Sequence, residues 1–253
     1  MNILFTICGR AGSKGIKNKN IKEFLGFPLP FYTVSVIDLF IKRNPGIRCD
    51  IVLNTDSIDL INIFKEQVLL KIDVIERIAE LARDNTPKIE VVFNCLEVMQ
   101  QREEVEYDMV IDLDLTSPLR TVKDVSNLIE KKMISSADVV FSVTNSRRNP
   151  YFNMVRKTES GYERVIASNF NARQEAPEIY DMNASLYAFS PSFLLSGKAI
   201  FEGRCDVIKM LDTAVLDLDH EGDFELMQVI ADYLFKTYPD FREVRENIKV
   251  CCK

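Results

Sequence analysis

Several residue types and patterns that mark particular classes of protein are scarce or missing in this chain of 253 residues. Tryptophan is absent and His220 is the single histidine, so chemistry that needs a histidine base would rest on His220 alone. The six cysteines show no C-x-x-C spacing, which argues against a zinc site and against a disulfide framework. We expect the adjacent Cys251 and Cys252 to lie in a frayed tail.

Long hydrophobic runs are also missing. No apolar stretch approaches the roughly 20 residues that span a bilayer, and the first residues lack the basic region of a signal peptide. With 47% hydrophobic and 28% charged residues, the composition is that of an ordinary globular protein. We therefore expect one cytoplasmic domain over residues 1–253, without a membrane partner.

The net charge of −6 offers no reason to expect a nucleic-acid partner. Its distribution is uneven, because no acidic residue precedes Glu23, whereas five basic residues do: Arg10, Lys14, Lys17, Lys19 and Lys22. This basic segment is also dense in glycine. The combination suits a small polyanion such as a triphosphate.

Apolar runs and helical periodicities alternate along most of the chain. The pattern predicts strands at 2–7, 50–55, 107–113, 138–143, 184–189 and 215–218. It predicts helices at 31–43, from Ser57 as N-cap to Phe64, after a Thr86 cap with Pro87 in the first turn, at 121–133 and at 221–236. Such alternation is typical of an α/β fold with three layers, in which helices cover both faces of a mostly parallel sheet.

The alternation fails between residues 146 and 181. This stretch is polar, irregular and rich in arginine. We interpret it as an insertion within the single domain, a hairpin or arm that pairs with another subunit.

Residues 8–15 connect the first predicted strand to the basic segment. Glycine lets backbone N–H groups approach phosphate oxygens closely, and lysine neutralises their charge. The glycines at 9, 12 and 15 match neither the dinucleotide fingerprint G-x-G-x-x-G nor the P-loop G-x-x-x-x-G-K-[ST]. A triphosphate cradle and a plain surface turn both remain open on this evidence.

Asp217 and Asp219 lie two residues apart in a predicted strand, so both carboxylates point to the same face. Two carboxylates can hold Mg²⁺, which prefers oxygen ligands and bridges phosphates. The same alternation also fits the solvent-facing half of an edge strand.

Residues 10–20 resemble the R-x-G-S-K-G-[IL]-x-x-K-N signature of the acylneuraminate cytidylyltransferases, which also act on other nonulosonic acids. Further similarities follow in the family's order, over nearly the whole chain. They are the segments 77–84 (R-P-x-x-L-A-x-D), 116–120 (T-S-P-L-R), 173–174 with 183 (R-Q…N-G-A) and 216–219 (I-D-I-D) ahead of 223–226 (D-F-E-L).

The resemblance implies a Rossmann-like nucleotidyltransferase fold and attack of a sugar's anomeric hydroxyl on the α-phosphate of CTP. It favours the metal interpretation of Asp217 and Asp219, with Mg²⁺ as cofactor, and implies a homodimer. Catalytic roles fall on Arg10, Lys19, Asp217 and Asp219. The nucleotide would contact Arg10, Ala11, Gly12, Ser13, Asn20, Arg77 and Thr86. The acidic sugar would contact Asp114, Thr116, Ser117, Arg173, Gln174 and Asn183.

Three departures from the family pattern leave the acceptor sugar open. Asp114-Leu115 replaces Gln-Pro, Ala184 replaces the glycine of N-G-A, and residues 151–153 stand near where some relatives carry a lysine. An acid at 114 would accept hydrogen bonds but repel a carboxylate. Two alternatives therefore stand beside this function: a related enzyme for another sugar or nucleobase, and a nucleotide-binding regulatory protein without activity.

Overall fold

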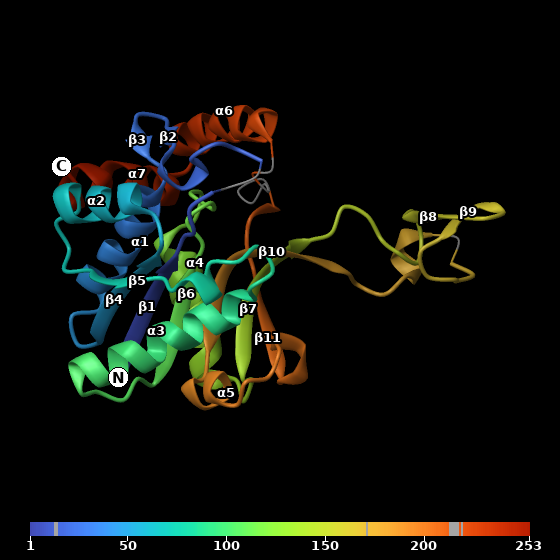
Figure 1. The fold of residues 1–253 in the computed structure, drawn as a ribbon. Coiled ribbons are helices and arrows are strands. Elements are labelled where there is room, and N and C mark those ends of the chain that lie inside the picture. Colours follow the sequence, from blue (N-terminus) through green and yellow to red (C-terminus); the bar gives the residue numbers. More distant parts are fainter. Residues whose placement is uncertain (13–14, 171, 213–217, 219) are drawn as a thin grey trace.

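The computed structural model describes residues 1–12, 15–170, 172–212, 218 and 220–253. Its centre is a seven-stranded sheet in the order β11-β7-β10-β6-β1-β4-β5 (Figure 1). These strands are β1 (Asn2–Cys8), β4 (Arg48–Thr55), β5 (Asp73–Glu76), β6 (Met109–Leu113), β7 (Val139–Asn145), β10 (Tyr180–Phe189) and β11 (Cys205–Lys209). Only β10 runs antiparallel to its neighbours, so the predicted mostly parallel sheet is confirmed.

Helices cover both faces of the sheet. One apolar core packs alternate β1 residues such as Phe5 against α1 (Pro30–Arg43), α2 (Ile58–Gln67), α4 (Val122–Ile134), α6 (Glu221–Thr237) and α7 (Pro239–Cys251). The other packs Leu4 against α3 (Lys88–Glu103) and α5 (Pro191–Leu195). The three-layer α/β prediction is therefore confirmed. No described helix is long and apolar enough to cross a membrane.

Among the five predicted helices, three starts are compared through their caps: that at Ser57 is confirmed, and Thr121 is the cap of a helix that begins one residue later, at Val122. The Ser57 hydroxyl accepts from the Leu60 N–H at 3.3 Å, and Thr121 forms a reciprocal capping box with Asp124. The third is wrong by one residue, because Pro87 is the extended cap residue and α3 begins at Lys88.

The prediction for the carboxyl end is wrong in two respects. Helix α6 is followed by α7, whose buried Phe241, Val244 and Ile248 recur at helical spacing. Cys251 and Cys252 are buried rather than frayed, since Cys252 forms a β-bridge with Val68. Strands β5 and β11 were not predicted, and residues 215–217 of the predicted strand 215–218 lie outside the described part of the chain.

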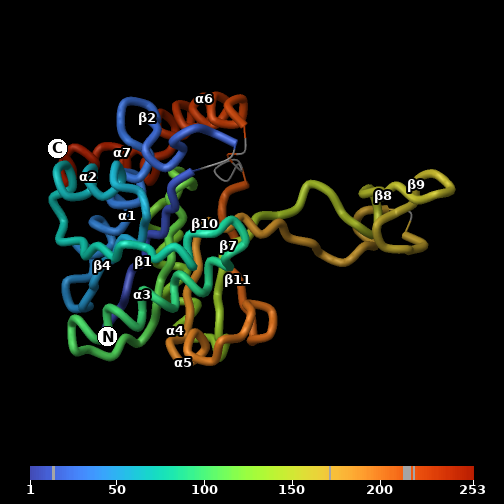
Figure 2. The backbone as a smooth tube through the Cα atoms, viewed as in Figure 1, coloured from blue at the N-terminus to red at the C-terminus, as the bar shows by residue number. Residues whose placement is uncertain are grey.

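Two hairpins lie outside the large sheet. A short one joins β2 (Glu23–Phe24) to β3 (Phe27–Pro28) beside α6. The other, β8 (Val155–Thr158) with β9 (Gly161–Arg164), lies in the stretch 146–181. That stretch, here called the arm, leaves the body at the ends of β7 and β10 and projects away from it (Figure 2). Its pairing with a second subunit stays a prediction.

Candidate functional site

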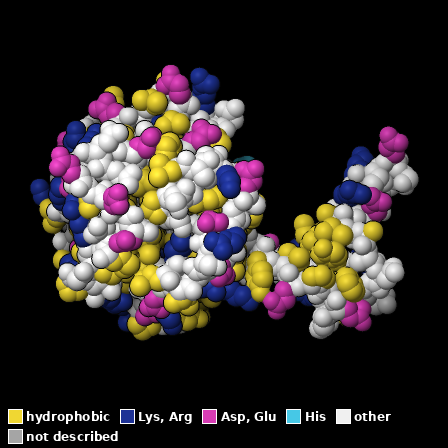
Figure 3. All heavy atoms as spheres, turned by 90° about the horizontal axis from the view of Figure 1, so that it is seen from below, with side chains coloured by type: hydrophobic (Ala, Val, Ile, Leu, Met, Phe, Trp, Pro, Cys, Tyr) yellow, Lys and Arg dark blue, Asp and Glu magenta, His cyan; other side chains and the backbone are white. Residues whose placement is uncertain are grey.

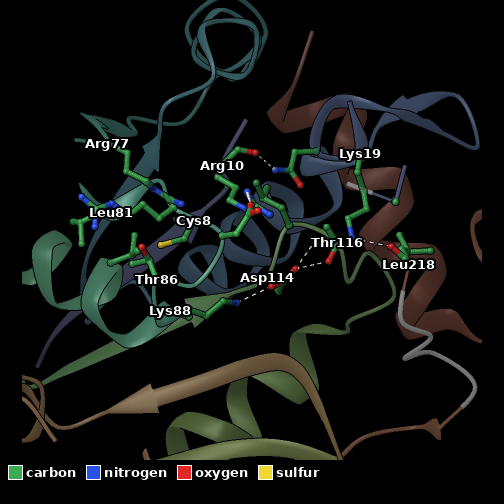
Figure 4. Close-up of a pocket in the computed structure, with 17 residues that line it drawn as sticks. Cys8, Arg10, Lys19, Arg77, Leu81, Thr86, Lys88, Asp114, Thr116 and Leu218 are labelled. Carbon is green, nitrogen blue, oxygen red and sulfur yellow. Dashed lines mark hydrogen bonds and ion pairs between the residues drawn. The ribbon is translucent and has the colours of Figure 1, made fainter. Parts of the chain in front are cut away.

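A cavity of about 400 Å³ opens at the carboxyl ends of β1, β4 and β6 (Figure 4). Ligands commonly bind at this edge of an open parallel sheet, because the loops that follow the strands meet there. The lining residues come from the glycine loop, from the segment after β5 through the start of α3, and from the turn after β6. They are Cys8, Gly9, Arg10, Gly15, Lys19, Asn20, Arg77, Leu81, Arg83, Asp84, Thr86, Lys88, Val91, Asp114, Leu115, Thr116 and Leu218.

The glycine loop follows β1 directly, with side chains packed closely against Gly9 and a left-handed backbone at Gly12. A Cβ on Gly9 would lie 2.4 Å from the Leu115 side chain, and Gly12 has a φ of +72°. The Asn20 side-chain amide donates to the Arg10 carbonyl at 2.9 Å and holds the loop's backbone. The predicted contact residue Ser13 lies outside the described residues.

Carboxylates occupy two of the loop's hydrogen-bond donors. The Ala11 N–H donates to Asp56 Oδ1 at 2.7 Å, and the Arg10 guanidinium forms an ion pair with Asp84. Donors that bind a carboxylate suit a phosphate equally well. The loop is therefore shaped for an anion, and a triphosphate would have to displace these two acids.

Lys19 connects the loop to the segment that carries the predicted metal ligands. Its ammonium donates to the Leu218 carbonyl at 2.7 Å, and Leu218 lines the cavity. Asp217 and Asp219 lie outside the described residues, so their metal role stays a prediction. Among the residues that the structure does describe, no three His, Cys, Asp or Glu side chains are grouped to hold a metal.

Arg77 and Thr86 line the side of the cavity next to α3. The Arg77 guanidinium donates to the Asn54 side chain at 2.7 Å and to the Asn54 carbonyl at 2.9 Å, which fixes its direction at the end of β4. The Thr86 hydroxyl donates to the Glu80 carbonyl at 3.2 Å. The structure thus brings both predicted nucleotide contacts into the same cavity as the glycine loop.

The floor holds a cluster of charges that sequence reasoning missed in part. The Lys88 ammonium lies 2.6 Å from Asp114 Oδ2 and 3.1 Å from Asp112 Oδ2. Burial acts to raise the pKa of Asp114, but Lys88 and the hydrogen bonds from Thr116 outweigh it and hold that pKa well below its usual range. Asp114 is therefore an ionised group whose charge is compensated, and the expected repulsion of a carboxylate is reduced.

Asp112 could have been found from the sequence, whereas Lys88 could not. Residues 111–114 read I-D-L-D, the same alternation that singled out Asp217 and Asp219. It places Asp112 and Asp114 on one face of β6, where buried carboxylates need a cation. Lys88 precedes Asp112 by 24 residues and reaches it only through the packing of α3, so no local sequence signal identifies it as the cation.

Ser117 and Asn183 lie behind the cavity and do not line it. Ser117 donates to the Ser185 hydroxyl at 2.7 Å, whereas the Asn183 side-chain oxygen Oδ1 accepts from the Ser142 hydroxyl at 2.6 Å and from the Ser185 N–H at 3.2 Å. Both side chains support the turn that carries Thr116. Their contact with a sugar stays a prediction.

Arg173 and Gln174 line a different cavity, of about 470 Å³, at the base of the arm. Arg148 and Lys209 also face it, and Arg173 donates to the Ser146 carbonyl. Within one chain the structure therefore does not bring these two predicted sugar contacts to the first cavity.

Cys8 is the one thiol in the lining of the first cavity. Its hydrogen bond with Cys95 and its burial raise the pKa of Cys8 well above the usual value. A neutral thiol is a poor nucleophile, so the arrangement favours chemistry by positioning and charge over covalent catalysis.

Comparison with known proteins agrees with this geometry. The sequence profile of the cytidylyltransferase family matches residues 4–234. Post-translational flagellin modification protein B of Campylobacter coli is 33% identical over 231 residues, which cover 90% of this chain and 94% of that protein. The CMP-N,N'-diacetyllegionaminic acid synthase of Campylobacter jejuni is 32% identical with the same coverage.

More distant similarities extend to other substrates and to solved structures. An N-acylneuraminate cytidylyltransferase of Streptococcus agalactiae is 26% identical, over 88% of this chain and 52% of that protein. The structure of a CMP:2-keto-3-deoxy-manno-octonic acid synthetase complexed with CTP superposes with a TM-score of 0.61, over 92% of this chain and 99% of that one. At 15% identity that last similarity supports the fold alone.

Proposed function

The chain belongs to the cytidylyltransferase family, and from that membership we propose that it joins CTP to an acidic 2-keto sugar, giving the CMP-sugar and pyrophosphate. Membership of this family makes it a nucleotidyltransferase enzyme. The observation that carries the proposal is the anion-shaped glycine loop in one cavity with Lys19, Arg77 and Lys88.

The chain's own residues supply positioning and charge in this reaction. The loop N–H groups and Arg10 would exchange Asp56 and Asp84 for phosphate oxygens, and Lys19 would stabilise the leaving pyrophosphate. Arg77 and Thr86 would hold the cytidine end. Transfer to the α-phosphorus needs in-line placement of the sugar hydroxyl rather than a covalent enzyme intermediate.

Mg²⁺ stays part of the proposal, with Asp217 and Asp219 as the residues that would hold it. Leu218, between them in the sequence, lines the cavity and is bonded to Lys19, so the segment is tied to the site. Carboxylate oxygens are the ligands that Mg²⁺ prefers. When bound, the ion would neutralise charge on the phosphates.

For the acceptor we propose a nonulosonic acid of the N,N'-diacetyllegionaminic type. The support is the 32% identity to a synthase of that CMP-sugar over 94% of its length, against 26% to an N-acylneuraminate enzyme. Asp114 in place of the family's glutamine fits a sugar other than sialic acid.

We further propose that the enzyme is a cytoplasmic homodimer formed through the arm. Exposed apolar side chains gather there, including Met154, Val155, Tyr162 and Ile166 (Figure 3). An apolar projection of this kind is typical of a contact surface.

A matrix of nucleoside triphosphates against acidic sugars, scored by pyrophosphate release with and without Mg²⁺, tests the function. We expect release with CTP and a diacetamido nonulosonic acid, and little with other bases or with the eight-carbon keto-deoxy acid. Absence of release with every pair would refute the proposed reaction, and equal release with UTP would refute the assignment of CTP.

A further inference from the structure

Lys88 connects helix α3 to strand β6 through two carboxylates at once. It is the first residue of α3, and its ammonium lies between Asp112 Oδ2 at 3.1 Å and Asp114 Oδ2 at 2.6 Å. Figure 4 shows the side chain pointing from the helix toward Asp114 across the cavity floor. In the described part of the chain, no other lysine or arginine forms an ion pair with either carboxylate.

The position of this lysine is unfavourable for the helix itself. The amino end of a helix carries the positive end of its dipole and prefers acidic side chains. A half-buried ion pair also rarely stabilises a fold more than apolar residues of similar size. The helix itself therefore gives no reason for a lysine here, whereas its two carboxylate partners and its place in the cavity lining do.

Asp114 links Lys88 to the turn after β6 through hydrogen bonds. Its Oδ1 accepts from both the N–H of Thr116, at 2.8 Å, and the Thr116 hydroxyl, at 2.6 Å. Its backbone carbonyl accepts from the buried Arg120 guanidinium at 2.8 Å. Both ends of the T-S-P-L-R turn are thus tied to Asp114, and Thr116 lines the cavity.

Asp112 makes the pair dependent on a cation. It is fully buried, its Oδ1 accepts from the Thr6 hydroxyl at 2.8 Å, and its Oδ2 has no hydrogen bond from the described residues. Without the Lys88 ammonium, the carboxylate of Asp112 on β6 and that of Asp114 just after it would share a buried site. Like charges that close cannot both stay ionised without displacing the turn or binding a proton.

We infer that Lys88 is a positioning residue of the transfer reaction, because its ammonium neutralises Asp112 and Asp114 together and so fixes the carboxylate that orients Thr116. The role in turnover rests on the proposed function. The charge compensation itself does not, and it can be measured in an inactive preparation.

Four variants test the inference: Lys88→Met, Asp114→Asn, the double variant, and Lys131→Met as the matched control. Lys131 lies on α4, outside the cavity lining, and forms an ion pair with Asp206 at 3.0 Å. Its side chain is exposed to a similar extent as that of Lys88. We expect Lys88→Met to lower kcat/KM by about 100-fold. Asp114→Asn removes one of the two uncompensated charges but keeps an acceptor for Thr116, so the double variant should recover at least about tenfold. Lys131→Met should retain wild-type activity.

The pH profile separates this role from a purely structural one. The groups that face Lys88 are Asp112 of β6 and Asp114 of the turn after it, with Arg120, Cys8 and Tyr187 nearby. In Lys88→Met one carboxyl should keep its proton to higher pH, so its pKa lies above the unfolded value. Stabilisation by that group is present at low pH and lost as the pH rises through the folded-state pKa.

Activity and urea-unfolding stability of Lys88→Met should therefore both fall between roughly pH 5 and 8. The wild type should lack this fall, and the double variant, which keeps only the buried Asp112 carboxylate, should show a smaller one. Unfolding alone decides the charge compensation if the wild type releases no pyrophosphate. The inference is overturned if kcat/KM of Lys88→Met stays within threefold of the wild-type value, or if the losses of this variant do not depend on pH. It is also overturned if the fold-decrease in kcat/KM of the double variant equals the product of the fold-decreases of the two single variants.

Discussion

At the scale of single residues, Arg10 is the side chain that we propose to contact the donor nucleotide. Its guanidinium is held by Asp84 at the mouth of the cavity and can exchange that carboxylate for a phosphate. We expect Arg10→Ala to raise KM for CTP by about 10- to 100-fold and to change kcat less, because the side chain binds ground state and transition state alike. Steady-state kinetics at saturating sugar measure this.

The control for that substitution is Arg43→Ala, which removes a surface arginine paired with Glu243 on α1 and α7. It should leave KM for CTP unchanged. If Arg10→Ala saturates with CTP as the wild type does, the glycine loop does not bind the triphosphate.

Asp217 and Asp219 are the residues that we propose as Mg²⁺ ligands. Replacing either with alanine should abolish pyrophosphate release, since the phosphate charge then lacks its counter-ion. Far-ultraviolet circular dichroism should show an unchanged fold. Full turnover of either variant in the presence of Mg²⁺ would exclude these two residues as metal ligands.

At the scale of elements, strand β10 contains an alanine in a backbone conformation that favours glycine. Ala184 has a φ of +54°, at the place where the register of β10 against β7 shifts, and it replaces the glycine of the family's N-G-A. Ala184→Gly should therefore raise the free energy of unfolding by about 1 kcal/mol. Urea titration measures the change.

The matched control is Ala188→Gly in the same strand, a buried position without positive φ. It should lower the free energy of unfolding by about 1 kcal/mol, because glycine increases the conformational entropy of the unfolded chain and relieves no backbone strain at this position. A destabilised Ala184→Gly variant would contradict the role assigned to the left-handed backbone.

The elements that sequence reasoning found are those with a local signal. Ser57 and Thr121 cap their helices, and the apolar runs of β1, β4, β6 and β7 are buried strands with their own composition. Strand β11 was missed because it pairs with β7 at the edge of the sheet, a tertiary signal. Helix α7 was missed although Phe241, Val244 and Ile248 recur at helical spacing and Pro239 lies in its first turn.

The same distinction holds for the candidate site. Arg10, Lys19, Arg77, Thr86 and the Asp114–Thr116 turn were predicted, and all line one cavity. Lys88 was not, since its partners on β6 become neighbours only in the folded chain. Arg173 and Gln174 were predicted for the sugar but lie at the base of the arm, because motif order does not give distance.

At the scale of the whole molecule, the arm is the surface through which we propose that two subunits associate. Tyr162, 75% exposed on β9, is the largest apolar side chain at its surface. We expect the wild type to sediment as a dimer at micromolar concentration and Tyr162→Glu to shift it toward monomer, since a charge in an apolar contact is costly. A monomeric wild type would contradict the arm's proposed role.

Ile134→Glu is the control for that measurement, because Ile134 is 83% exposed at the end of α4, on the body. This substitution adds the same charge and should leave the dimer intact. Dissociation by both substitutions would place the contact elsewhere or point to a general effect of charge.

Phosphorus-31 NMR of a single reaction shows whether the enzyme joins CTP to the proposed sugar. The purified chain is mixed with CTP, Mg²⁺ and N,N'-diacetyllegionaminic acid, and the spectra are followed with time. We expect the CTP signals to be replaced by one phosphodiester signal and by the signal of pyrophosphate, in equal molar amounts. Persistence of CTP, or its conversion to CDP and inorganic phosphate, would contradict the proposed reaction.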